Sequence, residues 1–347
     1  MRARSLAPGE PAAPGMVLAQ DVRDASGRIT LAKGAVLDLA GCSALARPGR
    51  APVHVLEMEP GDLHEELAGR RLARAVAGSH LDVGPLAGGA WPLLAKARGI
   101  VELDAARLAE VNGLDDLVVY LLPNLQIVLE GELVGRAKIV PFVTREELVA
   151  QAEALCGAGG VVQVRPFKPT RVAAVVMESL EPPQLARFRA AFEEKLRFFG
   201  SELVRIEVAQ ASPEALAQAL KTCVEAGAQL VTLAGSKPMD PLDPALQALQ
   251  RAGAKLEKHG VPAHPGTLLW LAWLPAPTGP VPIIGMPSCG LFSKATMFDL
   301  ILPRLLAGER LGKRELAAYG DGGLLSKDAL WRFPPYRPQA LRGELAE

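Results

Sequence analysis

The second half of the chain constrains the fold most, because short apolar runs alternate there with segments of helical periodicity. Apolar runs lie at 172–176, 203–208, 230–233 and 281–284, and between the first two the apolar residues recur at spacings of 3 and 4 residues. Strands and helices that alternate in this way build a mostly parallel sheet covered by helices. The sequence therefore predicts an α/β fold for residues 168–325, with a doubly wound, mostly parallel sheet in three layers.

The residues before this domain predict two smaller modules. Over residues 1–80, short β-favouring runs precede a helix predicted at 64–76, which indicates an α+β module. Residues 81–167 are predicted to form a β-rich module, because strand-like runs dominate there. The alternation of apolar and polar residues predicts one strand at 126–134. A Pro-interrupted stretch then leads into the α/β domain. We expect residues 326–347 to form a C-terminal tail.

Charge and cysteine usage limit the partners and the compartment. The 38 basic residues balance the 38 acidic ones, so the net charge is +0 and no overall field attracts a polyanion. No apolar stretch reaches the ~18 residues that a membrane span needs, and no signal peptide is indicated. The four cysteines are scattered, without a C-x-x-C pair. We therefore expect a cytoplasmic protein that binds neither nucleic acid nor a membrane.

Several familiar catalytic signatures are missing from the sequence. His64-Glu65 begins like a zincin motif, but no second histidine follows at the required spacing. The chain has neither a G-x-S-x-G elbow nor a G-x-G-x-x-G fingerprint. The usual support for a hydrolase or a dinucleotide-binding protein is therefore absent. Ligands of open parallel sheets bind beyond the carboxyl ends of the strands, so the loops there are the candidates for a site.

The first candidate loop follows the third predicted strand of the α/β domain and contains Gly235, Ser236, Lys237, Asp240 and Asp243. Glycine lets backbone amides approach a ligand, lysine neutralises phosphate, and carboxylates hold Mg²⁺, so the loop suits a phosphorylated, metal-assisted ligand. A structural alternative exists for both carboxylates. Asp243 precedes a proline, which is an ordinary helix start and the interpretation that we favour for it. Asp240 is equally suited to capping a turn.

A second candidate loop, residues 285–290, joins a buried strand to a helix predicted at 293–306. The free amides and macrodipole at the start of that helix, with Lys294 in its first turn, favour an anion. Cys289 would become a thiolate nucleophile under this positive influence. The alternative that we favour for Cys289 is a small buried hydrophobic residue. Between the two loops, residues 262–267 predict only a rigid turn.

Taken together, the three loops resemble the molybdopterin-binding family, which includes molybdopterin molybdenumtransferase. The family has a strand, a G-G-x-S-x-G-D-x-D loop, a P-G-K-P turn and a G-L-P-G-N-P segment that opens a helix. The counterparts here lie at 234–243, 264–267 and 285–290. The sequence is most similar to an abridged branch of the family, whose last loop carries a cysteine and a downstream lysine. Weak similarity extends from about residue 15 to 325.

This resemblance implies a site for molybdopterin or its adenylylated form. In the family, the transferase uses Mg²⁺ and molybdate to convert adenylylated molybdopterin into the molybdenum cofactor. Asp240 would then be the catalytic residue, and Asp240 and Asp243 would hold the metal or molybdate. The residues implied for binding the pterin and its phosphate are Gly235, Ser236, Lys237, Gly285, Ser288, Cys289 and Lys294.

Three departures from the family pattern favour an alternative function. Met177-Glu178-Ser179-Leu180 stands where the full-length transferases have a T-G-D-E loop. Thr267 replaces the lysine of the turn, and Ser288-Cys289-Gly290 replaces the G-N-P that follows the first Gly-x-Pro. A non-catalytic carrier or chaperone, which holds the finished cofactor for a molybdoenzyme client, would tolerate these changes. A hydrolase of pyridine-nucleotide derivatives draws only on fold analogy and ranks last. The resemblance also implies a homodimer.

Overall fold

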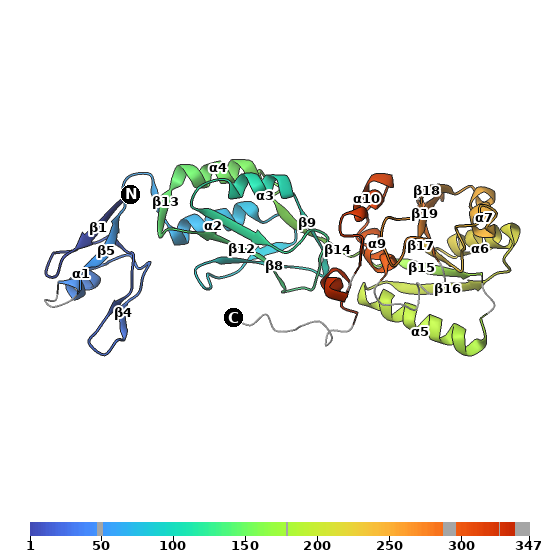
Figure 1. The fold of residues 1–347 in the computed structure, drawn as a ribbon, viewed down its shortest axis with the longest axis horizontal. Helices are drawn as coiled ribbons and strands as arrows, with labels where there is room; N and C mark the ends of the chain where they lie inside the picture. The colour runs from blue at the N-terminus through green and yellow to red at the C-terminus, as the bar shows by residue number, and fades with distance from the viewer. Residues whose placement is uncertain (47–50, 178–179, 287–295, 326, 337–347) are drawn as a thin grey trace. The chain divides into compact units, whose positions relative to one another are not determined.

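The chain divides into two compact units, each with its own hydrophobic core (Figure 1). The first comprises Met1–Ala97 with Val101–Arg165, and the second comprises Arg98–Ile100 with Pro166–Glu347. The finer division into four parts stays a prediction. The computed structural model describes residues 1–46, 51–177, 180–286, 296–325 and 327–336.

The start of the first unit is a small antiparallel sheet covered by one helix. Alternate residues of its strands point to one face, so Leu6 and Val55 meet Leu45 of the helix in a buried core. Asp38 caps the helix by accepting a hydrogen bond from the Gly41 amide at 2.7 Å. The elements are β1 (Arg2–Leu6), β2 (Val17–Leu18), β3 (Val22–Arg23), β4 (Ile29–Leu31), α1 (Leu39–Leu45) and β5 (Val53–Glu57).

The rest of the first unit is built from short strands and three helices around a second core, which includes Leu72, Leu93 and Val149. Four strands form a sheet in the order β10-β12-β8-β7, and three form a sheet in the order β11-β9-β14. The elements are β6 (Asp62–His64), α2 (Glu65–Val76), β7 (Leu81–Val83), β8 (Trp91–Ala95), β9 (Gly99–Leu103), α3 (Ala105–Asn112), β10 (Leu117–Leu121), β11 (Ile127–Val128), β12 (Leu133–Ile139), β13 (Val143–Arg145), α4 (Glu146–Cys156) and β14 (Val162–Pro166).

The single strand predicted at 126–134 is wrong, because the chain turns within it. The backbone amide of Glu132 donates to the carbonyl of Leu129 at 3.1 Å, and Gly131 has a positive φ of 79°. This turn ends β11 and sends β12 into a different sheet. Glycine is the residue that adopts this backbone conformation without strain, and it interrupts the alternating pattern at that point.

The second unit contains a mixed, mostly parallel sheet of six strands in the order β16-β15-β17-β20-β19-β18. The first four strands run parallel, β19 is antiparallel to β20, and β18 is antiparallel to β19. This confirms an α/β fold with a mostly parallel sheet, whereas the doubly wound, three-layer arrangement stays a prediction. The strands are β15 (Arg171–Val176), β16 (Glu202–Val208), β17 (Leu230–Ala234), β18 (Lys255–His259), β19 (Trp270–Leu274) and β20 (Val281–Met286).

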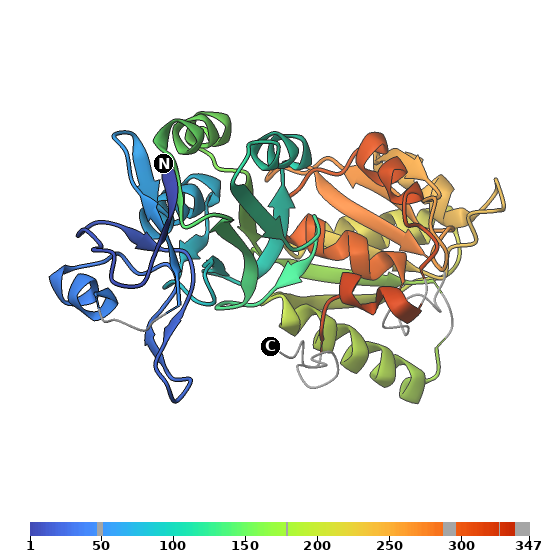
Figure 2. The same ribbon diagram turned by 60° about the vertical axis from the view of Figure 1, so that its left-hand side comes forward.

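Helices α6 (Pro213–Glu225) and α7 (Pro244–Ala252) pack beside the sheet and against each other (Figures 1 and 2). Their apolar faces join alternate strand residues in one core, as Leu220 and Leu249 do with Val175. Between the first two strands of this domain, the sequence predicts a helix with apolar residues every 3 or 4 positions. This helix is α5 (Pro182–Phe198), and its Phe188 and Phe192 are buried on one face as predicted. Burial of these side chains removes apolar surface from water and holds the helices in place.

The helix predicted at 293–306 differs at its start, since α9 spans Met297–Leu306. Thr296 is its N-cap, and the Asp299 carboxylate accepts from the Thr296 amide at 3.0 Å, which forms a capping box. The other Asp299 oxygen accepts from the Lys195 ammonium at 2.6 Å and from the Tyr336 hydroxyl at 2.7 Å. Burial and the adjacent Asp299 carboxylate raise the pKa of Tyr336 well above its usual value. The chain continues into α10 (Lys313–Ala317), η1 (Ala318–Gly320) and η2 (Lys327–Arg332).

The strand register brings the candidate loops to one edge of the sheet. Leu233 of β17 is opposite Gly285 of β20, and Gly285 is opposite Trp270 at the start of the antiparallel strand β19. The ends of β17 and β20 and the start of β19 therefore lie side by side, at what we call the carboxyl edge. The opposite side of the sheet, where β15, β17 and β20 begin, is the amino edge.

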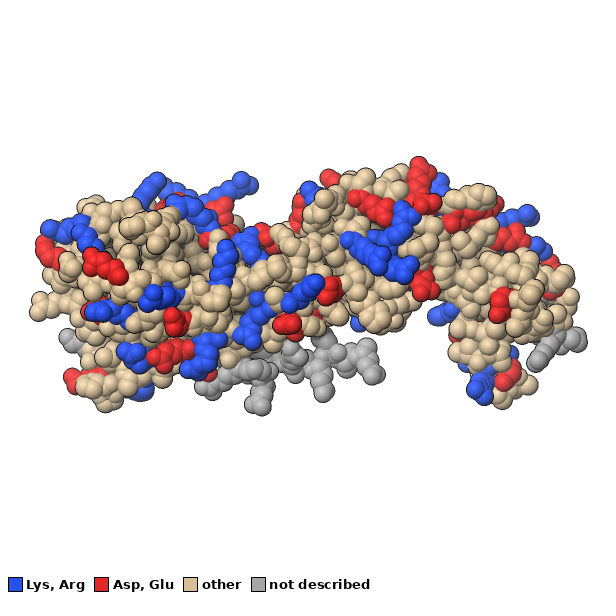
Figure 3. Space-filling model, turned by 180° about the vertical axis from the view of Figure 1, so that it is seen from behind, with Lys and Arg blue, Asp and Glu red and all other residues tan. Residues whose placement is uncertain are grey.

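On the face seen in Figure 3, basic and acidic side chains are interspersed over both units. Within the described part of the chain, none of the helices combines the length and the apolar character that crossing a bilayer requires.

We predict that Gly285→Ala destabilises the second unit. An added Cβ would lie 1.8 Å from the nearest ring atom of the buried Trp270, so the indole would have to move. Overpacking of this kind typically lowers the free energy of unfolding by about 1–3 kcal/mol. Urea denaturation of the variant and the unaltered chain measures this difference. Gly320→Ala is the control, because its Cβ would meet its nearest neighbour at 3.7 Å. Equal losses in the two variants would contradict the prediction.

Candidate functional site

The first candidate loop, residues 235–243, connects β17 to α7 at the carboxyl edge, and we call it the β17–α7 loop. It begins at Gly235, whose φ of 99° is in the region that favours glycine. The Gly235 amide donates to the carbonyl of Met286 at 3.0 Å, which continues the pairing of β17 with β20. The loop therefore leaves the sheet at a position fixed by both strands.

Asp243 holds the β17–α7 loop together from the inside. Its side chain is buried, and one carboxylate oxygen accepts from the Ala245 amide at 2.7 Å. The other oxygen accepts from the Lys237 amide and, at 3.4 Å, from the Ser236 hydroxyl. The first bond confirms that Asp243 is the N-cap of α7, with Pro244 in the first turn. The second oxygen closes the loop onto the same residue.

Trp270 joins this loop to the neighbouring strands. Its indole N–H donates to the Ser236 hydroxyl at 3.0 Å, and its ring occupies the space beside Gly285. Ser236 is only 1% exposed, and its hydroxyl both accepts from Trp270 and donates to Asp243. This chain of contacts positions the loop before any ligand arrives. A direct contact of Ser236 with a ligand stays a prediction.

Two charged side chains of the loop face outward. Lys237 and Asp240 are exposed, and no acceptor among the described residues lies within hydrogen-bond distance of the Lys237 ammonium. One Asp240 oxygen accepts from the Leu242 amide at 2.9 Å, which is the turn-capping role that the sequence also allowed. The exposed ammonium is therefore the group in this loop that is best placed to meet an anion.

The turn before β19 lies against the start of α9. A Cβ on Gly266 would lie 2.3 Å from the Met297 side chain, and the Met297 amide donates to the Pro265 carbonyl at 3.3 Å. The Thr267 hydroxyl donates to the Ala263 carbonyl at 2.7 Å, which closes the turn. His264 is exposed, and its peptide bond to Pro265 is cis.

The remaining predicted residues divide into one that is described and three that are not. Gly285 lies within β20, where the ring of Trp270 fills the space beside it, so packing alone accounts for a glycine there. Ser288, Cys289 and Lys294 lie outside the described residues. Their roles at the site stay predictions.

The described residues do not fit a Mg²⁺ site. Both oxygens of Asp243 already accept hydrogen bonds inside the loop, and Asp240 offers a single exposed carboxylate. Within the described ranges, no group of three or more His, Cys, Asp or Glu side chains is placed to hold a metal ion. A phosphate fits better, since it needs a cation and an accessible loop, and Lys237 provides the cation.

Sequence reasoning missed Trp270. The available signal was a tryptophan within an apolar run, four residues after the Gly266 of the Pro-Gly turn, but that pattern is equally typical of a core residue. Only the antiparallel direction of β19 places this indole beside the β17–α7 loop. The pattern of apolar residues does not specify strand direction, which explains the omission.

Comparison with known proteins places cofactor-assembly proteins among the structural neighbours. Neither a protein-family model nor a curated protein matches the sequence. A Corynebacterium diphtheriae protein with a proposed place in molybdenum cofactor biosynthesis matches at 15% identity and a TM-score of 0.30, over 40% of this chain and 94% of its own. The tungsten cofactor synthesizing protein MoaB from Pyrococcus furiosus matches at 12% identity and a TM-score of 0.27, over 35% of this chain and 83% of its own. CinA from Thermoplasma acidophilum, of unknown function, matches at 11% identity and a TM-score of 0.27, over 35% of this chain and 89% of its own.

We predict that Asp243→Asn loosens the β17–α7 loop. The variant keeps the size of the side chain but replaces one acceptor oxygen by an amide group, so one buried hydrogen bond is lost. The expected cost is about 1–2 kcal/mol in the free energy of unfolding, with faster hydrogen exchange at the Lys237 amide. Asp240→Asn is the matched control, because Asp240 is exposed, and it should cost less than about 0.5 kcal/mol. A larger loss in the control would contradict the assignment of Asp243.

Proposed function

We propose that the second unit binds a molybdopterin-type ligand at the carboxyl edge of its sheet and acts in molybdenum cofactor biosynthesis. The observation that carries this proposal is the β17–α7 loop, which is closed internally by Asp243 and presents the Lys237 ammonium to solvent. The loop occupies the place in the sequence where the chain resembles the molybdopterin-binding family. A phosphorylated pterin would find there a cation on a positioned loop.

The proposed role of each side chain depends on whether its polar group is exposed or already hydrogen-bonded within the protein. The Lys237 ammonium pairs with the phosphate, and it loses little by doing so because it is exposed and has no acceptor among the described residues. Asp243, Ser236 and Trp270 position the loop. Prearranged contacts reduce the entropy that is lost when a ligand binds. Asp240, exposed on the same loop, is the candidate for a role in chemistry.

The finer proposal is molybdate insertion into adenylylated molybdopterin. In this reaction water cleaves the phosphoanhydride bond that joins AMP to the pterin phosphate and supplies the oxygen that the products need, so AMP is released as the pterin takes up molybdate. In this proposal molybdate is a substrate, and Mg²⁺ would enter with the phosphates of the ligand, because the described residues form no site for it. Ser288, Cys289 and Lys294 would contribute to pterin binding. The alternative is a carrier that delivers the finished cofactor to a molybdoenzyme client. A homodimer is compatible with either function.

We predict that Lys237→Gln weakens binding of adenylylated molybdopterin about tenfold, because one charge-assisted contact with phosphate is lost. The fluorescence of the pterin gives the dissociation constant. Lys221→Gln is the matched control, since Lys221 is exposed on α6 and its loss removes the same charge. Equal affinities of the two variants for the ligand would argue against a phosphate site at this loop.

A turnover experiment separates the transferase from the carrier. The purified chain is incubated with adenylylated molybdopterin, Mg²⁺ and molybdate, and released AMP is measured. We expect AMP release from the unaltered chain and none from Asp240→Ala, with pterin binding retained in that variant. Tight binding without AMP release would instead support the carrier. Failure of the unaltered chain to bind the pterin would overturn both functions.

A further inference from the structure

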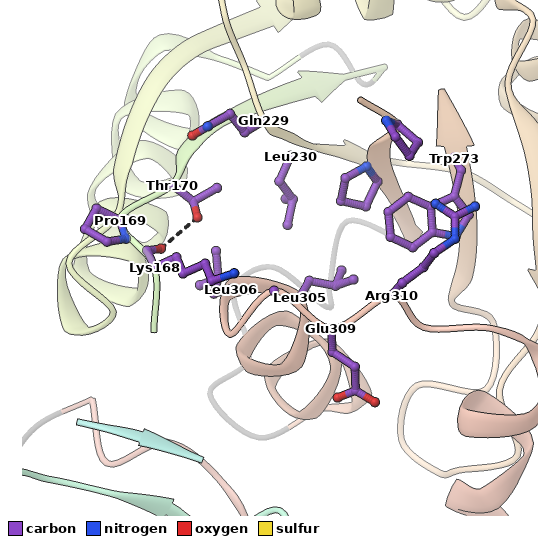
Figure 4. A pocket seen from close by; sticks show the side chains of 13 residues that line it. Lys168, Pro169, Thr170, Gln229, Leu230, Trp273, Leu305, Leu306, Glu309 and Arg310 are labelled. Carbon is purple, nitrogen blue, oxygen red and sulfur yellow. Dashed lines mark hydrogen bonds between the residues drawn. The ribbon is translucent and has the colours of Figure 1, made fainter. Parts of the chain in front are cut away.

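A separate hollow lies at the amino edge of the same sheet, opposite the β17–α7 loop (Figure 4). Its volume is about 520 Å³, within the range of small-molecule sites. The start of β17, the start of β20, the end of β19 and the end of α9 surround it. We call it the amino-edge pocket and define it by Lys168, Leu230, Trp273, Pro282, Leu306 and Arg310.

Part of the pocket wall is apolar. Leu230 is the first residue of β17, Pro282 is the second residue of β20, and Leu306 ends α9. Trp273 is 7% exposed, and the Arg310 guanidinium carbon lies 4.5 Å from the centroid of its ring. Arg310 therefore covers one face of the ring, and Trp273 offers the pocket only a small part of its surface. Together with Pro282 and Leu306 it forms an apolar wall for one side of a planar ring, which would replace water there.

The charges at the pocket are unbalanced. Figure 4 shows Lys168 on one side and Arg310 on the other. The carboxylate of the lining residue Glu309 points away from the hollow and pairs with the Arg304 guanidinium at 2.8 Å. Among the described residues, neither Lys168 nor Arg310 has a carboxylate within ion-pair distance. Two cations facing a pocket without a free carboxylate favour an anionic ligand.

The position of the Lys168 ammonium is set by its surroundings. The Lys168 amide donates to the Leu306 carbonyl at 2.8 Å, which fixes its backbone to the end of α9. Gly308 has a φ of 81°, and a Cβ there would lie 2.6 Å from the Lys168 ammonium. Glycine at this position therefore gives the ammonium the space it occupies beside Leu306 (Figure 4).

We propose that the amino-edge pocket binds a small aromatic anion. Its ring lies against Trp273 and the neighbouring apolar side chains, and its carboxylate or phosphate is held by Lys168 and Arg310. The pocket and the β17–α7 loop lie at opposite edges of the sheet, so this proposal does not depend on the proposed pterin site.

One feature of the pocket has a structural explanation that needs no ligand. Lys168 lies at the carboxyl end of α9, where a cation is favoured by the helix macrodipole. That explanation does not extend to Arg310, which follows the helix and lies over Trp273. The two cations must therefore be tested separately.

Isothermal titration of the full chain tests the proposal with two matched pairs of probes. AMP is compared with adenosine, and indole-3-carboxylate with indole-3-carboxamide, so each pair differs in the anionic group. We expect saturable binding of at least one anion below about 1 mM, and at least tenfold weaker binding of its neutral counterpart. Which anion binds distinguishes a phosphate ligand from a carboxylate ligand.

Three variants locate the binding. Lys168→Gln and Arg310→Gln should each raise the dissociation constant of that anion about tenfold. Arg314→Gln removes an equal charge from an exposed position on α10 and should leave it unchanged, as should Lys237→Gln at the carboxyl edge. Thermal melting confirms that each variant is folded.

Five results would overturn the proposal. Four concern binding: an absence of saturable binding by either anion, equal binding of the neutral counterparts, equal weakening by Arg314→Gln, and loss of binding only in Lys237→Gln. The fifth is a lower melting temperature of Lys168→Gln with an unchanged dissociation constant, which would assign Lys168 to the helix end alone. The pterin experiments on Lys237 are unaffected by any of these results.

Discussion

The contact of Trp270 with Gly285 and Ser236 organises the second unit. The indole fills a space that exists only because β20 carries a glycine there, and its N–H reaches the loop that follows β17. Two strands, β19 and β20, and the loop after β17 are thereby joined through a single side chain. Asp243 completes the arrangement, since its buried carboxylate ties the same serine to the start of α7. A buried polar group is stable when its hydrogen bonds are satisfied, and here each bond also positions the loop.

The mixed direction of the strands accounts for the separation of the two surfaces that we propose to bind ligands. Because β19 is antiparallel to β20, Trp270 lies at the carboxyl edge while Trp273, three residues later, lies at the amino edge. The first tryptophan supports the loop proposed to bind the pterin phosphate. The second forms a wall of the amino-edge pocket, beneath Arg310. The strands between them are buried, so the two surfaces share a rigid support.

Much of the second unit could be predicted from the sequence, because its signals are local. The apolar runs identified β15, β16, β17 and β20, and the Asp-Pro pair identified the start of α7. The highly charged β18 was missed, since its Lys255-Leu-Glu-Lys-His259 sequence has no apolar run. The turn that separates β11 from β12 and the start of α9 were also misjudged. Caps and tight turns at these positions compete with the periodic signal.

At the candidate site, the sequence indicated residues but not their partners. It proposed metal-binding and capping roles for Asp243, and the hydrogen bond from the Ala245 amide confirms the capping role. The engagement of Ser236 depends on Trp270, which lies 34 residues away in the chain. Contacts at that separation follow from strand order and direction, which no short motif encodes. The amino-edge pocket was missed for the same reason, since its cations come from segments before β15 and after α9.

The strand order also affects self-association of the chain. The outermost strands, β16 and β18, carry charged residues such as Arg205 and Lys258, and adding a strand from another molecule would strip water from them. Lateral growth of the sheet is therefore disfavoured, and the helices and loops of this unit are the surfaces better suited to contact between copies of the chain.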